Sequence, residues 1–295
     1  MTIKNETMPG VARYTHVVDI EQLRPQIETL VDEVVSSSLG HAAFAQALAS
    51  GMEETASSLR AVPATEGRML ERGIELIANR NPDLVVIADK PRLPVSKMAV
   101  ELVAMNDPRL VSKISLDADS GGRKTYTPDL VIANRARKIA HVIDVKRSLA
   151  SYEASRIKEL TDRMQAASAV VSDLLYRDYH RLYVNDVRVV ILNAENQRTN
   201  LDGVWPLSSL DHLLEITGAG QVMTCLRELF QRRVEANWSA ALSGHGSRLP
   251  AGVFAETTAI AGTIAALEDD PDALTDIPRI PVSIGLARLP RITVN

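Results

Sequence analysis

Apolar residues recur at alternating intervals of three and four near the start of the chain, which is the spacing of an amphipathic helix. Residues 19–40 carry such a stripe, and Pro25 indicates that its regular part starts close to that proline. Residues 41–62 form a second helical stretch whose weak point is Gly51. These residues show no recognisable chemistry, so 1–62 is predicted to be a helical N-terminal region that packs on the main body or on a second subunit.

The pattern then alternates between helix and strand. Residues 65–80 predict a third helix with Thr65 as its N-cap, and the apolar run in residues 82–95 predicts a short buried strand. A further helix is expected over residues 95–105. Residues 110–133 and 139–147 then predict a three-stranded antiparallel meander, with turns at Asp-Ser-Gly-Gly (119–122) and at residues 134–138.

The second half of the core returns to helices. Residues 152–176 place apolar side chains at steps of 3, 4, 3, 4 and 3, which predicts one core-facing helix, and residues 186–194 predict a buried strand. A long helical region, interrupted near residues 217–220, follows over 210–242. The chain therefore reads as an α/β protein with a mixed sheet, an antiparallel meander and flanking helices. Its core is assigned to residues 63–243.

The last fifty residues differ in composition. Five of the fourteen prolines lie at or after position 250, and "IPRIPV" nearly repeats as "LPRITV". Residues 244–295 are therefore predicted to form an extended arm, which either lies on the surface of its own domain or embraces a partner subunit.

Composition narrows the classes of protein. The single cysteine, Cys225, excludes an intrachain disulfide and fits a reducing cytoplasm. No CxxC or HExxH pattern occurs, so a zinc site is not expected, and His141 and His180 are interpreted as structural or exposed. The first ten residues lack the order of a signal peptide, and no apolar run approaches the ~18 residues of a membrane span. A cytoplasmic protein without membrane association is expected.

Charge is unevenly distributed along the chain. The net charge is −4, yet residues 121–163 contain ten Lys and Arg against five Asp and Glu. Such a segment can face an anion such as nucleic acid. The alternative is a solvated sheet edge and helix face, because lysine commonly protects sheet edges.

Charged residues also occur inside the predicted meander. Asp144 and Lys146 are two residues apart in one strand and therefore point to the same face. Asp129 opens the preceding strand, and an antiparallel pairing brings the start of that strand close to the end of the next. Two carboxylates are unfavourable neighbours unless a cation lies between them. Oxygen ligands favour Mg²⁺, whose shell the Val145 carbonyl could complete.

A lysine on the same face can orient or activate a water and stabilise charge on a phosphate. The combination suggests phosphodiester hydrolysis. The plainer interpretation is that Asp129 belongs to a turn, because Asp after Pro is common there, while Asp144 and Lys146 form a weak exposed ion pair.

"PD", a gap of fourteen residues and "DVK" together resemble the signature of the PD-(D/E)xK nuclease superfamily, whose core is the restriction-endonuclease-like fold. The resemblance covers about residues 65–195, including the order of helix, meander, helix and strand. It implies that Asp129 and Asp144 bind metal and that Lys146 is the catalytic lysine. An acidic residue of the first helix often assists, and Glu71 is the first choice. The alternatives are Glu66, Glu75 and Glu101.

The resemblance further implies a Mg²⁺-dependent DNA endonuclease of restriction or repair type, with Mn²⁺ as a possible substitute and with RNA not excluded as substrate. A homodimer is expected, because cleavage of a duplex needs two sites. The groups expected to hold the phosphate backbone are Arg147, Arg156, Arg163 and Gln165. Two rival functions stay open: an inactive module of the same fold that binds nucleic acid or protein, and a structural or assembly protein.

Overall fold

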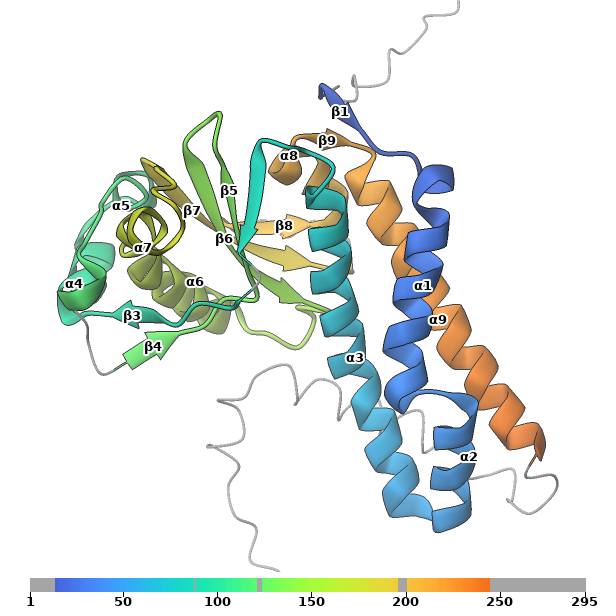
Figure 1. Ribbon diagram of the computed structural model, residues 1–295. Helices are drawn as coiled ribbons and strands as arrows, with labels where there is room; N and C mark the ends of the chain where they lie inside the picture. The colour runs from blue at the N-terminus through green and yellow to red at the C-terminus, as the bar shows by residue number, and fades with distance from the viewer. Residues whose placement is uncertain (1–13, 88, 121–123, 196–200, 245–295) are drawn as a thin grey trace, which may run out of the picture.

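The computed structural model describes residues 14–87, 89–120, 124–195 and 201–244. A bundle of long helices stands beside a twisted sheet that carries its own helices on the far side (Figure 1). The bundle contains α1 (Ile20–Ser38), α2 (His41–Ser50), α3 (Met52–Ala78) and α9 (Ala219–Gly244). The sheet contains β2 (Leu84–Ile87), β5 (Leu130–Asn134), β6 (Ile139–Lys146), β7 (Asp186–Asn193) and β8 (Val204–Pro206). The prediction of an α/β protein with a mixed sheet is confirmed.

The bundle differs from the predicted helices in two places. The helix α1 begins at Ile20, five residues before Pro25, because Asp19 caps it by accepting a hydrogen bond from the Glu21 amide. The helix predicted over residues 41–62 divides at its weak point, Gly51, and α3 joins the second half to the helix predicted over 65–80, so Thr65 lies buried in the interior of α3 instead of capping a new helix. Pro63 is also buried inside α3. Packing against α1, α2 and α9 compensates for the backbone hydrogen bond that a proline removes.

The sheet has the strand order β2-β5-β6-β7-β8. The strands β2, β5 and β6 form an antiparallel meander, and β7 and β8 extend the sheet in parallel with β6. The predicted first strand of the meander at residues 110–116 is wrong. Those residues begin in the short helix α5 (Pro108–Val111), which Asp107 caps, and continue without regular structure. Instead β2 pairs with β5, so the meander contains a long insertion between its first two strands.

The insertion spans residues 88–129, and its described parts lie on one side of the sheet. Its ordered parts are a two-stranded hairpin of β3 (Leu93–Val95) and β4 (Lys124–Tyr126), α4 (Lys97–Met105), α5 and the 3₁₀ turn η1 (Ala118–Ser120). The helix expected over residues 95–105 is therefore present. The hairpin packs against α6 (Ala154–Ser168), as does α4. Tyr126, the last residue of β4, enters the core between the sheet and α6.

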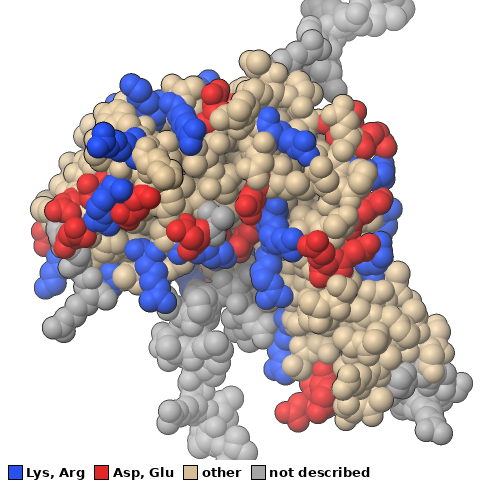
Figure 2. All heavy atoms as spheres, in the orientation of Figure 1, with Lys and Arg blue, Asp and Glu red and all other residues tan. Residues whose placement is uncertain are grey.

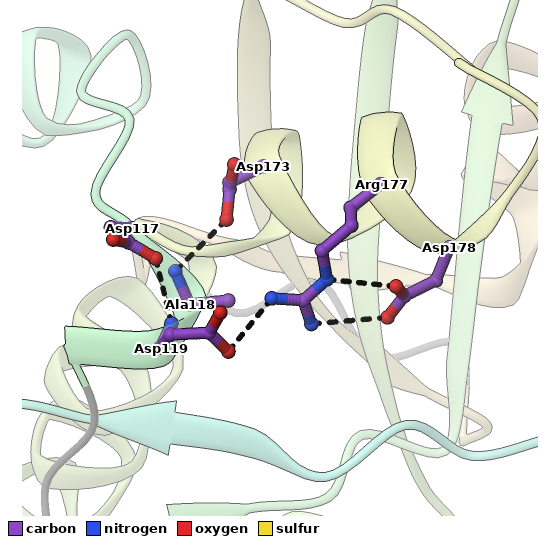
Figure 3. A network of polar contacts seen from close by, with 6 residues as sticks. All are labelled: Asp117, Ala118, Asp119, Asp173, Arg177 and Asp178. Carbon is purple, nitrogen blue, oxygen red and sulfur yellow. Dashed lines mark hydrogen bonds and ion pairs between the residues drawn. The ribbon is translucent and has the colours of Figure 1, made fainter.

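An ion-pair network fastens the insertion to α7 (Val171–Asp178). Arg177 contacts the carboxylates of Asp178 and Asp119, at 2.8 Å in both cases, while Asp173 accepts a hydrogen bond of 3.0 Å from the Ala118 amide (Figure 3). Exposed ion pairs contribute little free energy. The network therefore fixes the position of η1 on α7 more than it stabilises the fold.

The predicted single helix over residues 152–176 is divided into α6 and α7. The break lies at residues 169 and 170, where the Ala169 carbonyl accepts a hydrogen bond of 2.7 Å from the Leu116 amide. The predicted apolar stripe nevertheless lies against the core, with Ile157, Met164 and Val171 buried. In a continuous helix the Ala169 carbonyl would accept a hydrogen bond from within the helix, whereas here it accepts one from the insertion.

Alternation along the strands gives the sheet two different faces. Leu130, Ile132, Ile143 and Val145 join the core shared with the helical bundle. The opposite face of β5 and β6 packs under α6, α7 and the insertion, through residues such as Val131 and Val142. Asp144 and Lys146 follow Val142 at two-residue steps and so lie at the rim of this second core.

The remaining elements close one edge of the bundle: β1 (His16–Val17), the 3₁₀ turn η2 (Leu207–Ser209), α8 (Leu210–Leu214) and β9 (Ile216–Thr217). The expected boundary after residue 62 falls inside α3. The expected arm begins with the last residue of α9, and positions 245–295 lie outside the described residues. In the described part of the chain, no helix combines the length and apolar character needed to cross a membrane.

Candidate active site

The register of the hairpin brings Asp129 next to Asp144. Leu130 pairs with Ile143 in the antiparallel ladder, so the residue before Leu130 lies opposite the residue after Ile143. The Oδ2 of Asp129 accepts a hydrogen bond of 2.7 Å from the Val145 amide, which fixes this carboxylate at the end of β6. The two aspartates, fifteen positions apart in sequence, therefore lie at one end of a single hairpin, as the strand pattern predicts.

Asp144 is held by two side chains. The Nζ of Lys146 lies 2.9 Å from Oδ1, and the hydroxyl of Tyr126 donates a hydrogen bond of 2.5 Å to Oδ2. Oδ1 is buried, and its contact with Lys146 is an ion pair that falls short of a well-aligned hydrogen bond. Because the Asp144 side chain is 8% exposed and that of Lys146 is 16% exposed, this is not the exposed surface pair of the plainer interpretation.

The electrostatics of the site reflect crowded negative charge. Burial and then the charge of Asp144 raise the pKa of Asp129 to about 7, although the hydrogen bond from Val145 opposes them. Burial alone would lower the pKa of Lys146, but the neighbouring Asp144 outweighs burial and raises it above the ordinary range. Burial and the nearby carboxylates likewise raise the pKa of Tyr126. At neutral pH, Tyr126 is therefore a neutral hydrogen-bond donor and Lys146 is a cation.

Glu71 is the acidic helix residue that the structure places at this site. It lies on α3, its charge adds to the raised pKa of Asp129, and it forms an ion pair of 2.5 Å with Lys90. The other three candidates have different positions: the buried Glu66 pairs with Arg227 of α9, Glu75 lines the groove between α1 and α3, and Glu101 is exposed on α4. Of the four candidates, Glu71 is therefore the one whose charge contributes to the raised pKa of Asp129.

The four predicted phosphate-binding residues lie in different surroundings. Arg163 is exposed on α6, and its charge opposes the rise in the pKa of Tyr126. Arg156 is exposed seven residues earlier on the same helix, and Gln165 is half-buried on it. Arg147 follows β6 directly, and its Nε is buried without a hydrogen-bond partner. Of the four, Arg163 is the one whose charge is known to act on Tyr126, the hydrogen-bond partner of Asp144.

The two histidines fit their interpretation as structural or exposed residues. His141 lies in the middle of β6, and burial followed by the charge of Arg188 lowers its pKa to about 4. His180 is exposed in the turn after α7. Neither side chain is part of the aspartate pair.

The donor set can be compared with the needs of a metal ion. In the described ranges, no three His, Cys, Asp or Glu side chains gather in a way that could hold one. The site offers two carboxylates with the carbonyl of Val145, and Mg²⁺ usually takes one or two carboxylates and completes its shell with water and substrate phosphate. Two observations fit a cation: the buried Asp144 Oδ1 accepts no hydrogen bond, and the neighbouring charge raises the pKa of Asp129.

Two further polar residues at the site were not found from the sequence. Tyr126 comes from the insertion, and the only signal was its position three residues before Asp129. Asn193 is buried at the end of β7 and pairs with Lys146 in the parallel register, so the two side chains lie on the same face. Neither the position of Tyr126 nor that of Asn193 follows from the spacing of the motif, because each depends on how separate segments of the chain pack together.

Comparisons of this chain with protein-family models, curated proteins and solved structures find no match. The roles of the residues must therefore be argued from the geometry of the site.

Proposed function

We propose that this protein is a Mg²⁺-dependent nuclease that hydrolyses phosphodiester bonds of DNA. The observation that carries the proposal is the convergence of Asp129, Asp144 and Lys146 at one end of the β5–β6 hairpin, with Asp144 Oδ1 buried and without a hydrogen bond. Such an arrangement leaves two partly buried carboxylates beside one lysine, and a divalent cation would relieve their repulsion.

The order of elements supports a restriction-endonuclease-like core. The helix α3 precedes the antiparallel strands β2, β5 and β6, and α6 leads to β7, which is parallel to β6. This is the order that the resemblance to the PD-(D/E)xK superfamily implies, once the insertion between β2 and β5 is set aside. The helical bundle and the insertion are additions to that core.

Asp129, Asp144 and the Val145 carbonyl would hold the ion. When bound, Mg²⁺ would supply charge stabilisation and an activated water. Because its pKa is raised, Lys146 is charged at neutral pH and is better suited to orienting a water and stabilising negative charge on the phosphate than to removing a proton. Glu71 would support the site by adding negative charge near Asp129.

The substrate would be held by backbone contacts from Arg147, Arg156, Arg163 and Gln165. On the face shown in Figure 2, acidic and basic side chains are interspersed, so no extended positive field covers it. Action in the cytoplasm, as a homodimer on duplex DNA, would fit the single Cys225 and the need for two cuts.

The test is cleavage of plasmid DNA, single-stranded DNA and RNA by purified protein with Mg²⁺, Mn²⁺ or EDTA. We expect metal-dependent cutting that Asp144→Asn and Lys146→Met abolish. Lys158→Met is the matched control, because Lys158 also contacts a carboxylate, that of Asp162, but lies exposed on α6. Cutting that survives in Asp144→Asn would refute the proposal.

The same experiment separates the rivals. Salt-sensitive binding without cutting on any substrate would indicate a binding module of the same fold. Neither binding nor cutting would indicate a structural or assembly protein. Cleavage of RNA alone would retain the reaction type and change the substrate.

A further inference from the structure

Tyr126 reaches the site from a part of the chain outside the main sheet. It ends β4, where it pairs with Leu93 of β3, and the hairpin of β3 and β4 packs against α6. The Tyr126 residue is 7% exposed, so its ring is fixed in the core under α6. Its hydroxyl donates to Asp144 Oδ2 at 2.5 Å, a length typical of a hydrogen bond to an ionised carboxylate.

The two partners of Asp144 differ in rigidity. Tyr126 has two side-chain torsions and a buried ring, so its hydroxyl has one position. Lys146 has a flexible four-carbon stem and contacts Oδ1 without hydrogen-bond alignment. When an ion approaches, Lys146 can therefore withdraw from Oδ1, whereas Tyr126 keeps Oδ2 in place.

We propose that Tyr126 is a positioning residue that fixes the rotation of the Asp144 carboxylate so that Oδ1 is presented to the metal ion. This inference rests on the proposed function, because it requires Asp144 to bind metal. Carboxylates that ligate metals are commonly held by hydrogen bonds from a second layer of residues, and loss of such a bond lowers metal affinity 10- to 100-fold. The insertion thereby contributes to the site, since its last strand delivers the hydroxyl.

The test compares Mg²⁺ binding, measured by calorimetry without substrate, in the wild type and in Tyr126→Phe. Phenylalanine keeps the ring and removes only the hydroxyl. We expect the Kd for Mg²⁺ to rise on the order of 10- to 100-fold, while kcat at saturating Mg²⁺ stays within about threefold of the wild type. Tyr126→His, whose shorter ring does not reach Asp144 Oδ2, should bind Mg²⁺ as weakly as Tyr126→Phe.

Tyr14→Phe is the control, because it removes a tyrosine hydroxyl that contacts His212 on the other side of the molecule. It should leave the Kd unchanged. A Kd for both Tyr126 variants within twofold of the wild type would overturn the inference and leave the proposed function intact. So would a loss of kcat that added Mg²⁺ does not restore. Asp144→Asn is expected to bind no Mg²⁺. If the wild type also binds none, both the inference and the proposed function are overturned.

Discussion

Asp129 is predicted to destabilise the metal-free protein at neutral and alkaline pH. Burial and the adjacent Asp144 raise its pKa from 3.8 to about 7, so the folded chain binds this proton more tightly than the unfolded chain does. The contribution of Asp129 to stability is therefore complete below pH 3.8 and is lost progressively as the pH rises towards 7. Replacing Asp129 with asparagine removes the charge and keeps an oxygen that can accept from the Val145 amide.

The magnitude follows from the two pKa values. One pH unit corresponds to about 1.36 kcal/mol, so a pKa of about 7 in place of 3.8 amounts to at most about 4 kcal/mol. Relaxation of the half-buried carboxylate reduces this figure, and roughly 2 kcal/mol is a reasonable expectation at pH 8. Asp129→Asn should therefore be more stable than the wild type at pH 8 and of similar stability at pH 4.

The measurement is urea unfolding of both proteins, with EDTA present, at pH values from 4 to 8. Glu101→Gln, which changes an exposed carboxylate on α4, is the control and should follow the wild type at every pH. Addition of Mg²⁺ at pH 8 should stabilise the wild type but not Asp129→Asn, because only the former keeps both carboxylates. An Asp129→Asn protein that is equally or less stable than the wild type at pH 8 would refute this account of the site.

Two further predictions concern packing. Gly73→Ala would place its Cβ 2.4 Å from a methyl carbon of Leu226 at the crossing of α3 and α9, so the ends of the Leu226 and Met223 side chains must shift, and the fold should lose about 1 kcal/mol in urea unfolding. Gly67→Ala in the same helix meets nothing within 4 Å and should stabilise the fold by up to ~1 kcal/mol. Equal effects of the two changes would contradict the crossing. Arg227→Met should cost about 3–5 kcal/mol in the same assay, because it leaves the buried Glu66 unpaired and removes a contact with the backbone near the end of β7. Adding Glu66→Gln to Arg227→Met should recover part of that loss, and no recovery would mean that the ion pair does not explain it.

The position of Glu66 shows why an acidic residue on the right helix is not enough to assign a role. Its carboxylate faces α9 and pairs with Arg227, whose guanidinium also donates to the Ala194 carbonyl. The Ala194 amide in turn donates to the Lys146 carbonyl at 2.9 Å. Glu66 thus stabilises the backbone next to Lys146, whereas the charge of Glu71, five residues later, contributes to the raised pKa of Asp129.

Local pattern determined much of this protein. A period of two along β6 places Asp144 and Lys146 on one face, and the short connection to β5 leaves little choice of partner strand for Asp129. Helical stripes likewise located the buried faces of α1 and α6. These features involve residues close in sequence, where backbone geometry alone sets which side chains meet.

Tertiary structure decided the rest. The sequence assigned the first meander strand to residues 110–116, but long-range pairing gave that place to β2, more than forty residues before β5. Tertiary packing also kept α3 continuous through Pro63 and brought Tyr126 to Asp144. Each of these outcomes depends on contacts between segments that are far apart in the chain. The periodicity of a segment shows which face is buried, but not which distant segment will cover it.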